Sequence, residues 1–363
     1  MTAQGEARVL LRSAAAIALG IAGVCVEGIA PPASAQQAAQ IKFGGQFPPT
    51  FEYVYRHYAL DGGFLGKQGL RAEFVGFSAG LTGIQALASG SVDFACEGVG
   101  SFLAAIQAGA DLKIVFVPNA NNSYVIATRA SIDKPENLAG KKWAVTQVGA
   151  ISHSYAVLWL RQHNMKENSV DWIPIGGEAA RARALLAGQV DATLLNVGEL
   201  LRIEGQAGIK RMAYLRDTLP PLPNSACATT GKIVRERADV VQRFVSANLD
   251  AIRAARTPAG KQQYLAAAKK YDDHGYTDKQ YEELYDFYIA SPKNPLSLDP
   301  NGGMYPDVLQ ENMRIMVAAG SLKGLLPLER IWEPKFVLQY LADNGWFDIA
   351  TGKGGYYLKD LLK

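Results

Sequence analysis

Cysteine is scarce in this 363-residue chain. It occurs at three positions, Cys25, Cys96 and Cys227, whereas a small fold that depends on disulfides carries more of them in a shorter sequence. The wide separation of the three matches no zinc-binding spacing. Because unpaired cysteine is usually a small buried residue, two buried thiols at Cys96 and Cys227 are favoured over a disulfide between them. We predict no metal site and no cofactor.

An excess of charge of one sign is also lacking. The sequence has 37 basic and 34 acidic residues, a formal net charge of +3. A nucleic-acid-binding protein would show a basic field or cluster, so nucleic acid is not an expected partner. With 48% hydrophobic and 20% charged residues, the chain has the composition of a folded globular protein. Beyond residue 26, no run approaches the ~18 apolar residues that a membrane-spanning helix needs.

The first 35 residues have the features of a signal peptide. Two arginines precede an apolar stretch over residues 14–26, and Ala33-Ser34-Ala35 has the small-x-small pattern that signal peptidase recognises. We therefore predict cleavage after Ala35 and a periplasmic location. Lipid anchoring at Cys25 is the alternative, and it is less favoured because the residue before this cysteine is larger than such a site requires.

One local pattern occurs twice, about a hundred residues apart. Residues 87–95 and 186–194 each place an Ala/Leu-rich run before a glycine, Gly90 or Gly188, and continue with a short apolar strand that opens with Val-Asp. Glycine adopts the left-handed conformation that ends a helix, so each copy predicts a helix-to-strand joint. The separation is too long for a solenoid repeat and fits two α/β lobes of similar build. Function is then expected in a cleft between the lobes.

Alternating strand and helix patterns give the organisation of the remaining chain. We predict lobe 1 from residues 41–123 and 224–345, lobe 2 from residues 124–223, and a tail over residues 346–363. Polar and proline-rich breaks at 119–123 and 217–224 mark two crossovers between the lobes. The sequence after residue 235 is mostly helical, and we expect these helices to pack on lobe 1. The predicted strands cover 41–46, 71–76, 92–95, 113–118, 124–128, 142–146, 170–175, 190–196, 210–215 and 225–230. The predicted helices cover 50–60, 80–88, 101–108, 152–163, 178–187, 199–206, 238–255, 260–271, 278–289, 304–318 and 334–343.

The loops that follow the strands are the candidate ligand site. In open α/β sheets, ligands bind beyond the carboxyl ends of the strands, where the first N–H groups of the next helices lack partners. Such helix starts attract anionic or carbonyl-bearing solutes. We therefore predict a ligand-binding set made of Gln46, Phe47, Glu97, Gly98, Asn122, Gly149, Ala150, Ser152, His153, Asn196 and Glu199.

Several polar residues also have a purely structural interpretation. Ser152 suits a helix cap, and a lone histidine such as His153 is more often an exposed or satisfied side chain than a ligand contact. Glu97 fits a solvated loop, but if it faces the cleft it disfavours a purely anionic solute or pairs with a ligand amine. Arg181 is expected to be a surface charge, with contact to a ligand carboxylate or sulfonate as the alternative.

Four short motifs give the chain a resemblance to a known family. Residues 63–70 (Gly-Phe-Leu-Gly-Lys-Gln-Gly-Leu), 86–93, 138–142 (Leu-Ala-Gly-Lys-Lys) and 185–191 stand in the order found in solute-binding proteins of the nitrate, sulfonate and taurine type. That group also includes binders of thiamine pyrimidine precursors. The resemblance implies a type II periplasmic binding protein fold. It further implies delivery of a small solute to an ABC permease. From the paired lobes and the two crossovers we expect a monomer that closes its lobes on that solute.

Two loops depart from the pattern of that family. Asn196-Val197-Gly198 stands where members often have Glu-Pro, and residues 96–101 lack a proline that commonly closes the loop. Both loops are expected to face the ligand, so the solute stays open among sulfonates, nitrate-like ions, carboxylates and pyrimidines.

An enzyme is the alternative class of function. The sequence has no Gly-x-Ser-x-Gly, His-Glu-x-x-His or phosphate-loop motif, so no catalytic residues are predicted. An enzyme that resembles pyrimidine-precursor synthases on the same fold and a sensory binding protein are the alternatives to transport.

Overall fold

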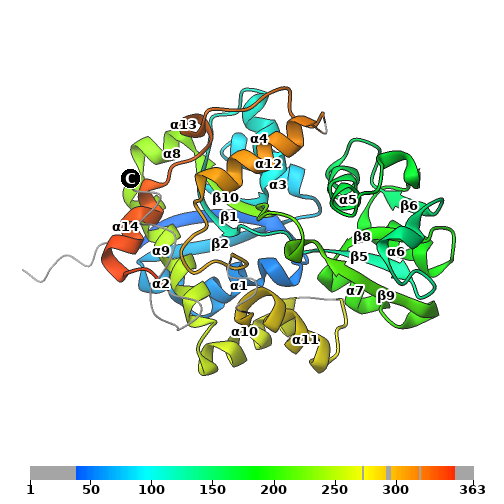
Figure 1. Ribbon diagram of the computed structural model, residues 1–363. Coiled ribbons are helices and arrows are strands. Elements are labelled where there is room, and N and C mark those ends of the chain that lie inside the picture. The colour runs from blue at the N-terminus through cyan, green and yellow to red at the C-terminus, as the bar shows by residue number, and fades with distance from the viewer. Residues whose placement is uncertain (1–37, 272–273, 292–295, 319, 348–363) are drawn as a thin grey trace, which may run out of the picture. The chain divides into compact units, whose positions relative to one another are not determined.

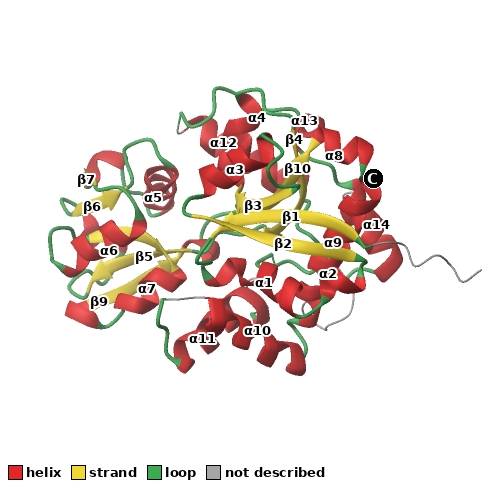
Figure 2. Cartoon of the chain, turned by 180° about the vertical axis from the view of Figure 1, so that it is seen from behind, coloured by secondary structure: helices red, strands yellow, loops and turns green. Residues whose placement is uncertain are grey.

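Two five-stranded sheets form the centre of the protein. The computed structural model describes residues 38–271, 274–291, 296–318 and 320–347, so the predicted signal peptide and nearly all of the predicted tail lie outside the described residues. The first sheet has the order β2-β1-β3-β10-β4 and the second β7-β6-β8-β5-β9; the strands are labelled in Figures 1 and 2. We call the first sheet with its helices lobe 1 and the second lobe 2. The strands are β1 Ala39–Gln46, β2 Leu70–Phe77, β3 Phe94–Gly98, β4 Leu112–Asn119, β5 Tyr124–Arg129, β6 Lys142–Val145, β7 Asp171–Pro174, β8 Ala192–Asn196, β9 Ile209–Tyr214 and β10 Ser225–Thr230.

The two sheets are built in the same way. In each sheet the first three strands are parallel, and the fourth is antiparallel to both of its neighbours. That fourth strand reaches its sheet directly from the other lobe. The chain leaves lobe 1 after β4 and enters lobe 2 as β5, and it leaves lobe 2 after β9 and re-enters lobe 1 as β10. Two α/β lobes joined by two crossovers are therefore confirmed.

The duplicated sequence pattern makes the same contacts in both lobes. Gly90 and Gly188 have φ values of 78° and 71°, the left-handed conformation expected after a helix. The Asp93 carboxylate accepts a hydrogen bond from the backbone N–H of Lys42 at 2.8 Å, and the Asp191 carboxylate accepts one from the N–H of Lys142 at 3.0 Å. Each aspartate thus binds a backbone N–H of the neighbouring parallel strand, β1 or β6.

Helices cover both faces of the first sheet (Figure 2). Phe244 of α9 stacks on Phe94 of β3 with ring centroids 3.9 Å apart, and the opposite face of the sheet packs against buried residues of α3, α4 and α12. Among the described residues, no helix combines the length and hydrophobicity needed to cross a membrane. The α-helices are α1 Val54–Asp61, α2 Phe64–Lys67, α3 Gly80–Ala88, α4 Val99–Gln107, α5 Ile151–Gln162, α6 Glu178–Leu186, α7 Val197–Ile203, α8 Gly231–Glu236, α9 Ala238–Ala254, α10 Pro258–Tyr271, α11 Asp278–Tyr285, α12 Pro306–Ala318, α13 Leu328–Ile331 and α14 Lys335–Asn344.

The carboxyl-terminal helices pack on lobe 1, as predicted, but two of them also contact lobe 2. In α11, Gln280 donates its side-chain N–H to the Leu201 carbonyl at 2.6 Å, and Glu283 pairs with Arg211 of β9 at 2.8 Å. In α12, the Asn312 amide lies 3.4 Å from the Tyr155 hydroxyl of α5. Amphipathic patterns show which face of a helix is buried, but not which lobe covers it.

The two internal cysteines form a disulfide, so the free-thiol interpretation is wrong. Cys96 of β3 lies directly opposite Cys227 of β10, and their sulfurs are bonded across a sequence separation of 131 residues. Both residues are buried. The two cysteines lie opposite each other only because the chain passes through lobe 2 and returns to lobe 1 as β10. A count of cysteines in the sequence cannot show this pairing.

We expect the disulfide to stabilise lobe 1. Replacement of both cysteines by alanine should lower the free energy of unfolding by roughly 2–4 kcal/mol, because the bridge closes a long loop in the unfolded chain. Thermal unfolding with and without dithiothreitol checks this. The reductant should lower the melting temperature of the wild type and leave that of C96A/C227A unchanged; equal effects on both proteins would contradict the prediction.

Candidate functional site

A cavity of about 500 Å³ lies between the two lobes. Strand ends, helix starts and both crossovers line it, which is the arrangement expected beyond the carboxyl ends of parallel strands. Residues from lobe 1, lobe 2 and the crossovers contribute, among them Gln46, Leu81, Ser123, Glu178, Asn196 and Asn224. Tyr276, from the segment before α11, also lines it.

The cavity brings together part of the predicted ligand-binding set. Gln46 ends β1, Glu97 and Gly98 end β3, and Asn196 ends β8. Glu199 lies in the first turn of α7, where its backbone N–H donates to the Asn196 side chain at 2.9 Å. Asn196 is thus the N-cap of α7 as well as a lining residue.

Two further predicted residues lie outside this lining. Phe47 is 44% exposed, and its ring packs against His57 and Phe74 with centroids 5.8 and 6.2 Å away. Asn122 is buried in the first crossover, where its side-chain oxygen accepts a hydrogen bond from the Tyr124 backbone N–H at 3.3 Å. Its role there is to shape the crossover.

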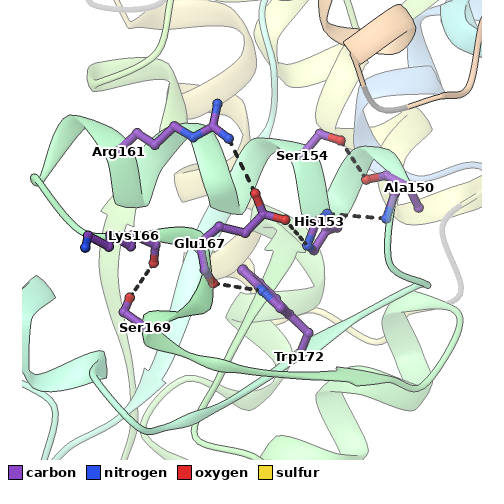
Figure 3. A network of polar contacts seen from close by, with 9 residues as sticks. Ala150, His153, Ser154, Arg161, Lys166, Glu167, Ser169 and Trp172 are labelled. Carbon is purple, nitrogen blue, oxygen red and sulfur yellow. Dashed lines mark hydrogen bonds and ion pairs between the residues drawn. The ribbon is translucent and has the colours of Figure 1, made fainter.

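The remaining predicted residues, Gly149, Ala150, Ser152 and His153, stand at the start of α5 and are not part of this lining; Figure 3 shows Ala150 and His153. His153 Nδ1 accepts from the Gly149 backbone N–H at 3.3 Å, and Nε2 lies 3.7 Å from the Glu167 carboxylate. Burial lowers the pKa of His153, against the opposing effect of Glu167. Ala150 is the N-cap position of α5, and Ser152, expected to cap this helix, instead donates to the Thr146 hydroxyl at 3.2 Å. Gly149 and His153 line a separate cavity of about 300 Å³.

A fully buried arginine fixes the loops on the lobe 1 side of the interlobe cavity. The Arg56 guanidinium donates to the carbonyls of Cys96 at 2.7 Å, Gln46 at 3.0 Å and Tyr53 at 3.2 Å. It joins the carboxyl ends of β1 and β3 to the turn before α1. A Cβ atom on Gly45 would overlap this guanidinium, so glycine is required at that position.

Arg181 does the same in lobe 2, so its expected place on the surface is wrong. The residue is 2% exposed. Its guanidinium donates to the Leu194 carbonyl at 3.0 Å, the Thr193 hydroxyl at 3.2 Å and the Thr146 hydroxyl at 2.9 Å. These donors hold the ends of β6 and β8 and do not line the cavity.

Two carboxylates, buried Glu52 and half-buried Glu178, face the cavity from opposite lobes. Glu52 of lobe 1 accepts hydrogen bonds from the side chains of Asn119 and Asn224 at 2.7 and 2.8 Å. Glu178 of lobe 2 accepts from the backbone and side-chain N–H groups of Asn196 at 3.0 and 2.7 Å. Burial raises the pKa of Glu52 to about 7, and the negative charge of Glu178 adds to this rise. Burial also raises the pKa of Glu178.

Glu97 is a third carboxylate in the lining, and it is buried rather than solvated. It is 3% exposed, and its Oε1 atom has no hydrogen-bond partner among the residues that the structure describes. Cβ atoms on Gly80 and Gly83 would lie only 2.7 and 2.8 Å from its oxygens, so the carboxylate packs against the first turn of α3. Burial raises the pKa of Glu97 to about 7, opposed by Arg56 and by a backbone hydrogen bond from Gln46.

Sequence reasoning missed Glu52 and Glu178 as lining residues. Glu178 follows Gly176-Gly177 at the start of a predicted helix. An acidic residue at this position is also explained by its favourable interaction with the helix dipole, without any contact to a ligand. Glu52 stands two residues after the Pro-Pro-Thr turn that the sequence already places near the ligand. The proximity of an acidic residue to a predicted site loop is the signal that could have indicated both.

Comparison with solved structures identifies the class of fold. The chain is similar to a putative periplasmic sulfonate-binding protein from Methylobacillus flagellatus KT, with 16% identity over 85% of this chain and 95% of that one and a TM-score of 0.68. It is also similar to the aliphatic sulphonate-binding protein of Escherichia coli (21% identity, 81% and 92% covered, TM-score 0.64). A third similar structure is the nitrate-binding protein of Synechocystis PCC 6803, with 12% identity over 85% of this chain and 89% of that one and a TM-score of 0.62. The protein has the fold of the periplasmic binding proteins.

A family model assigns the chain more narrowly. The model described as NMT1/THI5 like matches residues 51–259, which is more than half of the chain. The protein belongs to the NMT1/THI5-like family. No curated protein sequence matches it.

Replacement of Arg56 by methionine should destabilise the fold. Three backbone carbonyls lose a charged donor, and we expect the free energy of unfolding to fall by roughly 3–5 kcal/mol. Urea denaturation measures the loss. Arg71→Met is the control, because Arg71 is exposed and its replacement should change stability by no more than about 0.5 kcal/mol. A loss for R56M as small as that of the control would contradict the prediction.

Stability should fall as the pH rises from about 4.5 to about 7. In this window native Glu97, whose pKa is raised from 4.5 to about 7, keeps a proton that the unfolded chain releases, so the native state binds more protons. Glu97→Gln should make the dependence shallower by up to about 1.4 kcal/mol per pH unit. Urea denaturation across the window tests this. The exposed control Glu136→Gln should match the wild type, whereas an unchanged slope in E97Q would show that Glu97 does not titrate as described.

Proposed function

We propose that this protein is an extracytoplasmic solute-binding protein that delivers a small solute to an ABC importer. The observation that carries the proposal is the interlobe cavity, which residues from both lobes and both crossovers line together. The similar structures named above are described as sulfonate-binding and nitrate-binding proteins rather than enzymes. The signal-peptide pattern before Gln36 supports a periplasmic location, and we expect a monomer.

The solute would be enclosed by movement of the lobes. Residues 120–123 and 215–224 are the chain connections between the sheets, and rotation about such segments closes two lobes on a ligand. A closed cavity excludes water, which strengthens each hydrogen bond to the solute. Micromolar affinity corresponds to about 8 kcal/mol, within reach of a few aimed hydrogen bonds in such a cavity. The permease would then distinguish the closed form from the open one.

Leu81 offers a test of where the solute binds. It is 60% exposed and lines the interlobe cavity from the first turn of α3. Leu81→Trp should fill part of the cavity and weaken solute binding at least tenfold with little change in stability. A thermal-shift screen of small organic cations and anions identifies a binding solute, because a ligand raises the melting temperature. Isothermal titration calorimetry then measures its Kd in the variant.

Val148→Trp is the matched control. Val148 is 59% exposed and lines the separate cavity beside His153. The same substitution there should leave the Kd unchanged. Loss of binding in V148W with full binding in L81W would place the solute at the wrong cavity for this proposal. No melting-temperature rise with any solute would count against the function itself.

A further inference from the structure

The interlobe cavity has an acidic lining. Glu52, Glu97, Glu178 and Glu199 contribute to it, and none of the described lining residues is lysine or arginine. Glu199 pairs with Arg202 at 3.2 Å, and the other three carboxylates make no ion pair among the described residues. A cavity that binds sulfonate or nitrate is favoured by positive charge or by free N–H donors in its lining.

Two of the helix starts at the cavity lie against the protein's own carboxylates. The Glu97 carboxylate packs against Gly80 and Gly83 in the first turn of α3. The Glu178 carboxylate accepts from the N–H of Asn196, the N-cap residue of α7. These are the positions where backbone N–H groups would otherwise attract an anionic ligand. An anion that entered the cavity would therefore meet negative charge at both places.

The buried arginines near the cavity cannot reverse this balance by direct contact. Arg56 directs its donors to three backbone carbonyls. Arg181 directs its donors to the ends of β6 and β8 and to the Gly176 carbonyl. Their charges offset part of the acidity, but neither side chain lines the cavity.

Glu97 also has an unsatisfied acceptor among the described residues. The side chain is buried and lines the cavity, yet its Oε1 atom has no hydrogen-bond partner among the described residues. A buried acceptor without a partner is costly. Across the cavity, Glu52 and Glu178 belong to different lobes and repel each other electrostatically. A ligand with positively charged N–H groups would satisfy Glu97 and remove this repulsion between the lobes.

We propose that the solute is a small organic cation whose charge lies on N–H groups, such as an ammonium, amidinium or guanidinium, bound between Glu97 and Glu52 of lobe 1 and Glu178 of lobe 2. The inference rests on the proposed solute-binding function and narrows it to one class of solute. Tyr124 lines the same cavity and is an aromatic neighbour for a cation, whereas the Arg56 guanidinium already lies 4.6 Å from the centroid of the Tyr53 ring. A bound metal ion fits less well, because no group of three or more His, Cys, Asp or Glu side chains in the described residues could hold one.

Charge-matched pairs of probes test the inference. Benzamidinium is compared with benzoate and with neutral benzamide, and propylammonium with propanesulfonate, by thermal shift and calorimetry on the purified protein. The cations should bind and the anions should not. Glu97→Gln and Glu178→Gln, which keep the side-chain shape, should each weaken cation binding roughly 10–100-fold, the value of a hydrogen bond to a charged group. The exposed control Glu136→Gln should have the wild-type Kd.

The number of protons released or taken up on binding is a second readout. Its sign should be opposite for cations and anions. Glu97 faces Arg56 and the Gln46 backbone, and its pKa is raised to about 7 by burial. A cation favours the ionised carboxylate, so its binding near neutral pH should release protons, whereas an anion should cause proton uptake. Calorimetry in buffers of different ionisation enthalpy measures the number exchanged.

The possible results separate this inference from the proposed function. Anion binding that L81W abolishes would overturn the inference and leave the solute-binding function standing. Equal affinity for benzamidinium and benzamide, or cation binding unchanged in both E97Q and E178Q, would also overturn the inference alone. Failure of every probe in both charge classes to bind would count against the inference and the proposed function together.

Discussion

One buried arginine in each lobe holds the strand ends that form the interlobe cavity. Arg56 and Arg181 are almost inaccessible to solvent, and both direct their guanidinium groups to carbonyl and hydroxyl oxygens at the ends of parallel strands. A buried cation is tolerated only when its donors are satisfied and negative charge lies nearby. The carboxylates of Glu97 and Glu178 provide that charge. The two buried arginines therefore explain both why the loops are fixed and why carboxylates lie beside the cavity.

The two lobes share the same structural plan. Both use an aspartate after a left-handed glycine to fix a parallel strand, and both accept one antiparallel strand from the other lobe. The exchange of strands makes each sheet depend on the path of the chain through the other. A carboxylate such as Glu52 can then be held by Asn119 before the first crossover and Asn224 at the end of the second.

Local patterns in the sequence predict the elements well, and long-range contacts account for what they miss. The helix over 80–88 is found with the predicted bounds, since its glycine stop and apolar spacing are local signals. Strand β3 begins later than predicted and continues through Glu97 and Gly98, because β10 pairs along it after returning from lobe 2. Arg181 looks like a surface residue until the sheet brings Thr146 and Leu194 beside it. The position of Glu52 depends on partners 67 and 172 residues away, which no local pattern contains.

The contacts of α11 and α12 with lobe 2 bear on how the lobes can move. If only the two crossovers joined the lobes, a hinge could open freely about those two segments. The Arg211–Glu283 ion pair and the bond from Gln280 to the Leu201 carbonyl tie α11 to β9 and α7, so separation of the lobes must either break these contacts or carry α11 along. The rigid unit that moves with lobe 2 would then include α11, which lies more than sixty residues after β9, the last strand of that lobe. The two crossovers alone would not mark the boundary of this unit.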